Sequence, residues 1–197
     1  MLKNSFLALI VSFFIFQTAM AQEPTKPAPT TTPAPVTANP ALVAANPADV
    51  SSIDGVMKAV YDVISGDAGV PRNWDRFRSL FHKDARLIPS GKNAKTGVHG
   101  ANAMTPEDYI KRVEPVFAKD GFHEIEIARR CETFGNIAHC FSSYSSKRKK
   151  TDEKPFMRGI NSFQLMNDGT RWWVMTIYWQ QESPENPIPE KYLKNGN

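Results

Sequence analysis

The stretch that decides the fold covers residues 156–181 and reads FMRGINSFQLMNDGTRWWVMTIYWQQ. Apolar and polar residues alternate on both sides of Asp168-Gly169, which predicts two antiparallel strands joined by a tight turn at that dipeptide. A two-residue turn pairs Leu165 with Trp172, and alternation then sorts the side chains onto two faces. The first face carries Asn161, Phe163, Leu165, Trp172, Val174, Thr176 and Tyr178. The second face carries Ile160, Ser162, Gln164, Trp173, Met175, Ile177 and Trp179.

Both faces of this hairpin are largely apolar, so neither is expected to face water alone. We expect one face to cover helices. We expect the other to be covered by something else, such as a second subunit.

The first residues are not expected to belong to the fold. Lys3, an apolar run over residues 6–16 and Ala19-Met20-Ala21 have the order of a secretory signal peptide, so residues 1–21 are predicted to be removed. The apolar run is short for a bilayer span, which predicts no stable membrane insertion, with an uncleaved anchor as the alternative. The mature chain is therefore expected in the periplasm or outside the cell, where disulfides form.

The rest of the chain is predicted to hold one folded domain. Residues 22–47 are rich in Pro, Thr and Ala and lack aromatic residues, which predicts a disordered linker. The domain is expected over residues 48–182, followed by a C-terminal tail over residues 183–197. The formal charge of +4 becomes +3 once Lys3 is removed, which is too mild to indicate nucleic acid binding.

Three helices are predicted from capping residues and helical spacing of apolar side chains. The first starts near Ser51 and ends near Gly66. The second opens near Pro71. The third has the clearest start, a capping box at Thr105 with Pro at the first helical position, and Pro115 is expected to kink or end it.

A short strand is predicted between the second and third helices. Residues 86–89 read as a brief edge strand because Pro89 removes a ladder donor, and residues 90–104 are polar and contain Gly, as in a loop. A four-stranded antiparallel meander follows the third helix.

The first two strands of that meander are predicted at residues 122–134 and 137–147, with Gly135-Asn136 as their turn. This register places Cys131 directly opposite Cys140, at a non-hydrogen-bonded pair where the Cα atoms approach closely. With an export signal in front, we predict a Cys131–Cys140 disulfide; two reduced core thiols are the alternative.

The same register sorts this hairpin into two sides. The side expected to meet the helices carries Ile125, Ile127, Arg129, Cys131, Ala138, Cys140, Ser142 and Tyr144. The more polar side carries Glu124, Glu126, Arg130, Glu132, His139 and Ser143. The predicted interior therefore contains no strand carboxylate.

Several motifs in this order resemble the nuclear transport factor 2-like superfamily, in its SnoaL-like bacterial branch, over residues 50–182. They are Trp74-Asp75-Arg76-Phe77, the run from Leu80 to Ala85, the run from Phe134 to His139, and Asp168 to Trp172 leading to Tyr178-Trp179. The resemblance implies an α+β fold in which a cone-shaped, curved antiparallel sheet wraps around three N-terminal helices and encloses an apolar pocket. It also implies a homodimer through the convex sheet face, at Trp173, Met175, Ile177 and Trp179.

Enzymes of this superfamily place an Asp–His or Tyr–Asp pair inside the cone, and fold alone does not give function. We predict His123, Tyr144 and Tyr178 as catalytic candidates, because acid–base work needs a tunable group within reach of substrate. The predicted binding residues are Tyr61, Trp74, Arg129, Asn161, Thr176 and Tyr178. Each also has a plain structural interpretation as a solvated or mutually satisfied polar group.

No two histidines have metal-ligand spacing and the two cysteines are expected to pair with each other, so neither a metal site nor a cofactor is expected.

The first functional hypothesis is a domain that binds a small, mostly apolar molecule. The alternatives are a dehydratase- or isomerase-type enzyme that uses His123 with a pocket tyrosine, and a ligand-free interaction domain of the cell envelope. A carboxylate or histidine deep in an open cone favours the enzyme, whereas a solid cone favours the interaction domain.

Overall fold

The computed structural model describes residues 44–93 and 95–194, which belong to one compact unit of the chain, Asn39–Asn197. The predicted signal peptide and most of the predicted linker lie outside the described residues. Among the described residues, no helix is long and apolar enough to cross a bilayer. The elements are, in chain order, α1 (Pro47–Val50), α2 (Ile53–Ile64), α3 (Trp74–Leu80), β1 (Phe81–Lys92), β2 (His99–Ala101), α4 (Pro106–Asp120), β3 (His123–Phe134), β4 (Ile137–Lys147), β5 (Met157–Asn167), β6 (Trp172–Gln181) and a final 3₁₀ turn η1 (Glu190–Tyr192).

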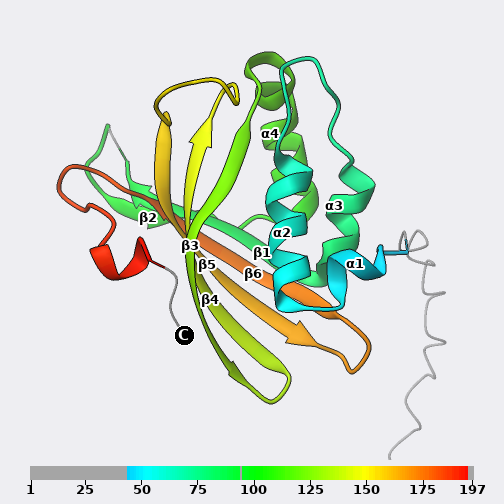
Figure 1. Cartoon of the computed structure of the whole chain (residues 1–197). Helices are drawn as coiled ribbons and strands as arrows, with labels where there is room; N and C mark the ends of the chain where they lie inside the picture. The colour runs from blue at the N-terminus through cyan, green and yellow to red at the C-terminus, as the bar shows by residue number, and fades with distance from the viewer. Residues whose placement is uncertain (1–43, 94, 195–197) are drawn as a thin grey trace, which may run out of the picture. The chain divides into compact units, whose positions relative to one another are not determined.

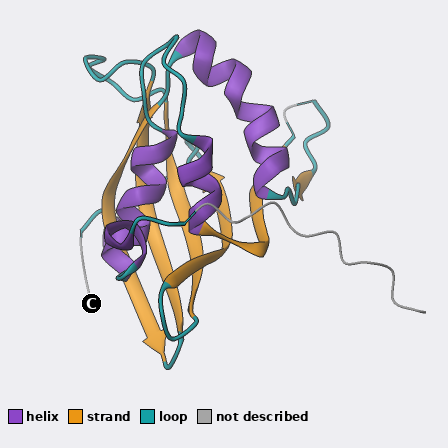
Figure 2. Ribbon diagram, turned by 90° about the vertical axis from the view of Figure 1, so that its right-hand side faces the viewer, coloured by secondary structure: helices purple, strands orange, loops and turns teal. Residues whose placement is uncertain are grey.

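Six strands form one curved, unclosed sheet in the order β2-β1-β6-β5-β4-β3 (Figure 1). The β1–β6 pair is parallel, and the other neighbouring pairs are antiparallel. Helices α2, α3 and α4 lie on one side of this sheet (Figure 2). The predicted α+β fold with a cone-shaped sheet around three helices is confirmed, with a short α1 and the parallel pair as additions.

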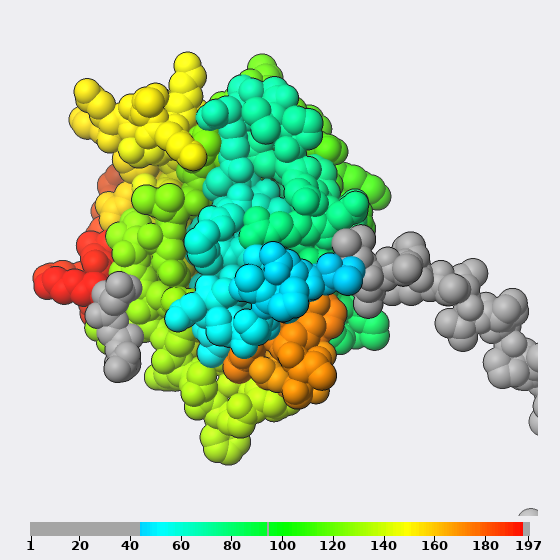
Figure 3. Space-filling model, turned by 45° about the vertical axis from the view of Figure 1, so that its right-hand side comes forward, coloured from blue at the N-terminus to red at the C-terminus, as the bar shows by residue number. Residues whose placement is uncertain are grey.

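The core fills the space between the helices and the concave side of the sheet. Each fully buried apolar side chain there stabilises the fold by about 1.5–3 kcal/mol relative to an exposed one. Its most deeply buried members are Val56, Met57, Phe77, Leu80, Phe163, Leu165 and Val174. The helical layer also reaches the β5–β6 tip, where α1 and α2, in blue and cyan, lie beside the orange hairpin end (Figure 3). Arg171 in that tip donates from Nη2 to the carbonyl oxygen of Ser79 at 2.5 Å.

The ends of α2 and the start of α3 differ from the predictions. Ser52, not Ser51, caps α2, because Ser51 closes α1 instead. The C-cap of α2 is Ser65, while the backbone of Gly66 pairs with Phe122. Helix α3 begins at Trp74 after an Asn73 cap, not near Pro71.

The capping box of α4 at Thr105 is confirmed, with the Asp108 amide donating to the Thr105 hydroxyl at 3.1 Å. Of the two outcomes predicted for Pro115, a kink or the end of the helix, the end is wrong, because the helix continues to Asp120. Pro115 lies on the exposed side of α4, where the carbonyl that loses its helical partner can bond water.

The strand expected at residues 86–89 is neither brief nor at the edge. β1 is twelve residues long and lies between β2 and β6. Pro89 lies within this strand without an amide proton to donate, and its carbonyl oxygen accepts a hydrogen bond from the Asn102 amide at 3.1 Å. The edge position belongs to β2, inside the region predicted to be a loop.

The tip of the β3–β4 hairpin follows the predicted register. Gly135 has a positive φ of 55° in the two-residue turn, and Cys131 pairs with Cys140. The predicted disulfide is present, with a Cα–Cα distance of 4.1 Å.

The tip of the β5–β6 hairpin is larger than predicted. Its loop spans residues 168–171, closed by the Asp168 amide donating to the Arg171 carbonyl oxygen at 3.1 Å. The Asp168 carboxylate also accepts from the amides of Thr170 and Arg171, which makes a four-residue turn preferable to the two-residue turn. The register moves by two residues, to Leu165 opposite Val174, so the faces next to the tip stay as predicted.

Each hairpin contains one β-bulge, and the bulges reverse the faces beyond them. In β3, Glu126 pairs with Tyr144 and Ala128 with Ser143, which leaves Ile127 as the extra residue. The predicted faces of residues 123–126 are therefore wrong: Glu124 and Glu126 turn toward the helices, and Ile125 is 61% exposed.

In β6, the extra residue is Met175, because Gln164 pairs with Thr176 while Leu165 pairs with Val174. Beyond it, Ile177 is buried at 6% exposure, whereas Tyr178 is 45% exposed. The inward placement predicted for Thr176 and Tyr178 is therefore wrong, as is the outward placement of Ile177 and Trp179.

The outer side of the sheet is partly covered by the chain's own C-terminal tail. Ile188 is buried, and the Tyr192 ring packs on Phe141 with their centroids 5.3 Å apart. The Ser143 hydroxyl donates to the Tyr192 carbonyl oxygen at 2.6 Å. Homodimerisation stays a prediction, although Ile177 and Trp179, two of the four residues named for it, lie on the inner side of the sheet.

Candidate functional site

A cavity of about 180 Å³ lies between the helices and the concave side of the sheet. It is smaller than the ~300–1,000 Å³ of pockets for drug-sized ligands, so it suits a compact molecule. Its polar groups come from Tyr109, Glu124, Tyr144 and Asn161. The apolar wall consists of Val60, Ile64, Phe77, Leu87, Val113, Phe117, Phe122, Met157, Phe163, Ile177 and Trp179.

Glu124 is the carboxylate of this cavity. It stands near the start of β3, on the part of the strand that the Ile127 bulge turns inward. Its Oε2 accepts from the Ser146 hydroxyl at 2.7 Å, and its Oε1 accepts from Asn161 Nδ2 at 3.4 Å. Burial among apolar side chains raises the pKa of Glu124 to about 7, although these two hydrogen bonds act in the opposite direction.

Tyr144, on β4, places a second functional group in the cavity. It is 1% exposed, and its hydroxyl has no hydrogen-bond partner among the described residues. Burial and the nearby charges of Glu124 and Glu182 raise the pKa of Tyr144. The ring has room because Gly159 lies opposite it in β5, where a Cβ atom would come within 2.6 Å of the hydroxyl oxygen.

Tyr109 on α4 completes the polar part of the lining. Its ring stacks on Phe77 with centroids 5.5 Å apart and planes inclined by 11°. Burial and the charge of Glu124 raise the pKa of Tyr109. A titratable carboxyl thus faces two neutral phenols across an apolar space, an arrangement that can move a proton and donate hydrogen bonds to a ligand oxygen.

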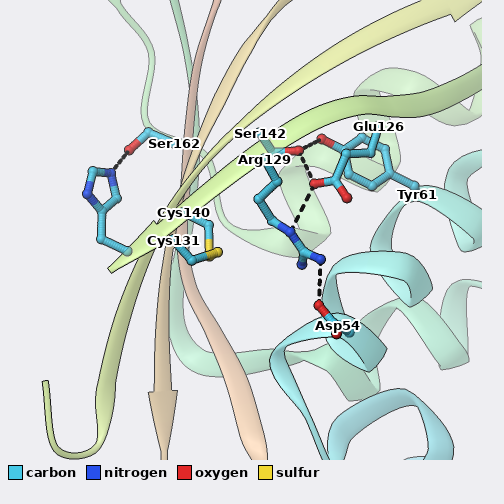
Figure 4. The surroundings of a disulfide bond; sticks show 9 residues. Asp54, Tyr61, Glu126, Arg129, Cys131, Cys140, Ser142 and Ser162 are labelled. Atoms are coloured by element: carbon cyan, nitrogen blue, oxygen red, sulfur yellow. Dashed lines mark hydrogen bonds and ion pairs between the residues drawn. A yellow bond between two sulfur atoms is a disulfide. The ribbon is translucent and has the colours of Figure 1, made fainter. Parts of the chain in front are cut away.

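A second polar cluster lies behind Asn161, and Figure 4 shows most of it. Tyr61 on α2 is buried, and its hydroxyl lies 2.6 Å from the Ser142 hydroxyl on β4. Ser142 in turn donates to Glu126, which pairs with Arg129. Of the predicted binding residues, the structure brings together Tyr61, Arg129 and Asn161, and only Asn161 lines the cavity.

The remaining predicted residues lie elsewhere. His123 is buried at the start of β3 and its Nε2 lies 2.7 Å from Asp67 Oδ1, outside the cavity lining. Trp74 donates from Nε1 to Glu114 at 2.8 Å. Thr176 and Tyr178 are on the outer side of the sheet. Among the described residues, no group of three or more His, Cys, Asp or Glu side chains could hold a metal ion.

Comparison with known proteins finds likeness in structure only. No family model and no curated protein matches the sequence. A protein of unknown function with a cystatin-like fold from Nostoc punctiforme is 10% identical, with a TM-score of 0.50 over 70% of this chain and 92% of that chain. A nuclear transport factor 2-like protein of unknown function from Methylobacillus flagellatus is 13% identical, with a TM-score of 0.41 over 67% of this chain and 95% of that one. Another, from Silicibacter pomeroyi, is 10% identical, with a TM-score of 0.44 over 67% and 94%.

At these identities the likeness shows the fold alone. Together with the order of helices and strands, the match with a TM-score of 0.50 confirms the fold that the resemblance implied. The SnoaL-like branch and export stay predictions.

Sequence reasoning missed Glu124 because alternation in Glu124-Ile125-Glu126-Ile127 is as regular as in an unbroken strand. None of those four residue types indicates a bulge. The one signal available is that the predicted inner side placed a charged residue, Arg129, beside the two isoleucines.

Proposed function

We propose that this chain binds a small, mostly apolar molecule in its cavity and transfers a proton to or from it, with Glu124 as the acid–base group. The observation that carries this proposal is the position of the Glu124 carboxyl in the lining of an apolar cavity, beside the hydroxyl of Tyr144, which is unpartnered within the described part of the chain. Burial there raises the pKa of Glu124 to about 7. A general acid or base works best when its pKa lies near the operating pH, and burial is how proteins bring a carboxyl there. The cavity itself argues against a solid, ligand-free scaffold.

The reaction class that fits is proton abstraction next to a carbonyl group, as in an isomerase or a dehydratase. Glu124 takes the proton, and the substrate oxygen that gains negative charge accepts a hydrogen bond from the Tyr144 hydroxyl. That hydroxyl has no protein partner among the described residues, so a ligand oxygen would satisfy it. The apolar wall holds the substrate and keeps water from the developing charge. In this proposal Glu124 takes the role that the sequence suggested for His123.

The test is hydrogen–deuterium exchange at the α-carbon of a small cyclic ketone such as cyclohexanone in D₂O, followed by proton NMR. We expect the wild-type protein to accelerate exchange, with a rate that rises with pH around an inflection near 7, because only ionised Glu124 is a base. Glu124→Gln should reduce the rate by about 10²-fold or more. Tyr144→Phe should reduce it by about 10²-fold.

Tyr178→Phe is the matched control, because it removes a phenol hydroxyl from the outer side of the sheet and should leave the rate unchanged. Equal rates in wild type and Glu124→Gln would contradict the catalytic role. If no exchange exceeds that in buffer while ketone signals still show saturable binding, the chain is a binding protein without this reaction.

We also propose that the protein is exported. The Cys131–Cys140 disulfide supports this, because such bonds persist in oxidising compartments. Sequencing of the amino terminus of protein recovered from its host should begin at Gln22. A mature protein that still begins at Met1 would contradict cleavage.

A further inference from the structure

A row of hydrogen bonds leads away from the cavity carboxyl through the protein interior. Asn161 Nδ2 contacts Glu124 Oε1 at 3.4 Å and Tyr61 Oη at 3.1 Å. The Tyr61 hydroxyl lies 2.6 Å from the Ser142 hydroxyl, which donates to Glu126 Oε1 at 2.6 Å. The three middle members are buried and come from α2, β4 and β5. We call these five residues the Glu124–Glu126 chain.

The direction of every hydrogen bond in this chain follows from its far end. An ionised carboxylate only accepts, so the single hydroxyl proton of Ser142 is used on Glu126. Tyr61 must then donate its proton to Ser142, and its lone pairs are left to accept from Asn161. The Asn161 amide is thereby held with its NH₂ group toward Glu124, since the flipped amide would turn its carbonyl oxygen toward both Glu124 and the Tyr61 lone pairs.

The far end is anchored by charge. Arg129 Nε lies 3.6 Å from Glu126 Oε1, and Arg129 Nη2 donates to Asp54 Oδ1 at 2.5 Å (Figure 4). Arg129 therefore joins two carboxylates, one from β3 and one from the first turn of α2. Glu126 Oε1, which accepts from the Ser142 hydroxyl, therefore has a positive charge beside it.

The disulfide lies next to this anchor. Arg129 pairs with Ser142 in the β3–β4 ladder, two residues beyond the Cys131–Cys140 pair. The covalent bond thus fixes the register of the two strands that bring Arg129 and Ser142 together.

We propose that Glu126, Ser142, Tyr61 and Asn161 act as positioning residues that hold one amide N–H on Glu124. The hydrogen-bonding part of this inference stands on the geometry; its catalytic consequence rests on the proposed function. Besides these residues, Tyr109 from α4 and Tyr144 and Ser146 from β4 also face Glu124. The charge of Glu126 reaches Tyr61, and that of Glu182 reaches Tyr144.

The test is a pH titration of ligand-free protein by carbon NMR of glutamate labelled at the side-chain carboxyl, with the Glu124 signal assigned by its absence in Glu124→Gln. Tyr61→Phe removes the acceptor that holds Asn161. Ser142→Ala frees the Tyr61 proton to turn toward Asn161, whose carbonyl oxygen then faces Glu124. The first change loosens the Asn161 N–H on the ionised carboxylate and the second turns it away, so both should raise the Glu124 pKa by about half a unit to one unit.

Ser143→Ala is the matched control. It removes a hydroxyl from the next residue of the same strand, one that donates to the Tyr192 carbonyl oxygen on the other side of the sheet. It should leave the Glu124 pKa unchanged, whatever it does to stability. The same Glu124 pKa in wild type, Tyr61→Phe and Ser142→Ala would overturn the proposal.

This readout separates the inference from the proposed function. Shifted Glu124 pKa values together with no ketone exchange would support the positioning chain and contradict proton transfer on that ketone. Unshifted Glu124 pKa values together with Glu124-dependent ketone exchange would support proton transfer and contradict the positioning chain.

Discussion

The β3–β4 and β5–β6 hairpins are built alike and contribute differently to the cavity. Each has a turn at its tip and one extra residue part-way along one strand, Ile127 in β3 and Met175 in β6. In β3 the bulge turns a carboxylate, Glu124, toward the helices. In β6 it turns Ile177 and Trp179 inward and sends Tyr178 out.

The comparison shows that the same backbone feature, a β-bulge, places a carboxylate on one wall of the cavity and apolar side chains on the other. A single inserted residue exchanges the two faces of everything beyond it, because side chains alternate with a period of two. The consequence depends only on which residues follow the insertion.

The largest expected effect tests the β6 bulge. Ile177→Ala should lower the free energy of unfolding by about 3 kcal/mol, because it empties a buried position. Tyr178→Ala, at the next residue, should cost less than about 1 kcal/mol, because that ring is half exposed. Urea denaturation of both variants measures the difference. A larger loss of stability for Tyr178→Ala than for Ile177→Ala would contradict the bulge in β6.

A smaller loss is expected where the two hairpins meet. Gly159→Ala would place a Cβ atom 2.3 Å from the Gln180 carbonyl oxygen and 2.6 Å from the Tyr144 hydroxyl, so we expect a loss of about 2–3 kcal/mol from overpacking. Gly91→Ala is the control, since a Cβ there has open space around it. Equal melting temperatures for the two variants would contradict the close approach of Tyr144 to β5.

The disulfide distinguishes the β3–β4 tip from the β5–β6 tip. Replacing both cysteines by serine should lower the free energy of unfolding by about 2 kcal/mol, because the closed loop is short. Thermal unfolding with and without reductant measures this, and reductant should have no effect on the double variant. A wild-type protein that reacts with two equivalents of thiol reagent before reduction would show that the bond is absent.

The smallest effect concerns Glu124 and depends on pH. The raised pKa means that the folded protein binds this proton more tightly than the unfolded chain, so the free energy of unfolding should fall as pH rises from about 4.5 to 7. Glu124→Gln removes that dependence. It should therefore be more stable than wild type by about 1 kcal/mol at pH 8, after allowance for solvent in the cavity, and no more stable at pH 4. A constant difference between the two proteins across this range would contradict the raised pKa.

Much of the fold could be predicted from the sequence because its signals are local. The Cys131–Cys140 pairing follows from a two-residue turn only four pairs away, and the α4 start follows from Thr105 and its capping box. The error at the start of α2 arose because two adjacent residues, Ser51 and Ser52, can serve as the cap. The error at α3 arose because Pro71 was taken as the signal for the start, whereas the side chain of Asn73 caps the helix.

The candidate site could not be predicted because it lies beyond the bulges. Assigning alternate residues of β3 to the inner and outer sides, counted from the turn, is correct as far as Ala128 and wrong at Glu124. No residue type identifies Ile127 as the extra residue. The position of a bulge depends on how the sheet bends around the helices, which is a tertiary property. Tyr144 and Asn161 lie on strands without an insertion between them and the tip, and their inward placement was predicted.

The most direct test of this account is the pKa of Glu124 in the ligand-free wild-type protein, measured by carbon NMR of its carboxyl group. If Ile127 is bulged and Glu124 faces the apolar cavity, the pKa should be about 7. A value near the ordinary 4.5 of a solvated glutamate would place the carboxylate on the outside of the sheet and contradict the site built on it.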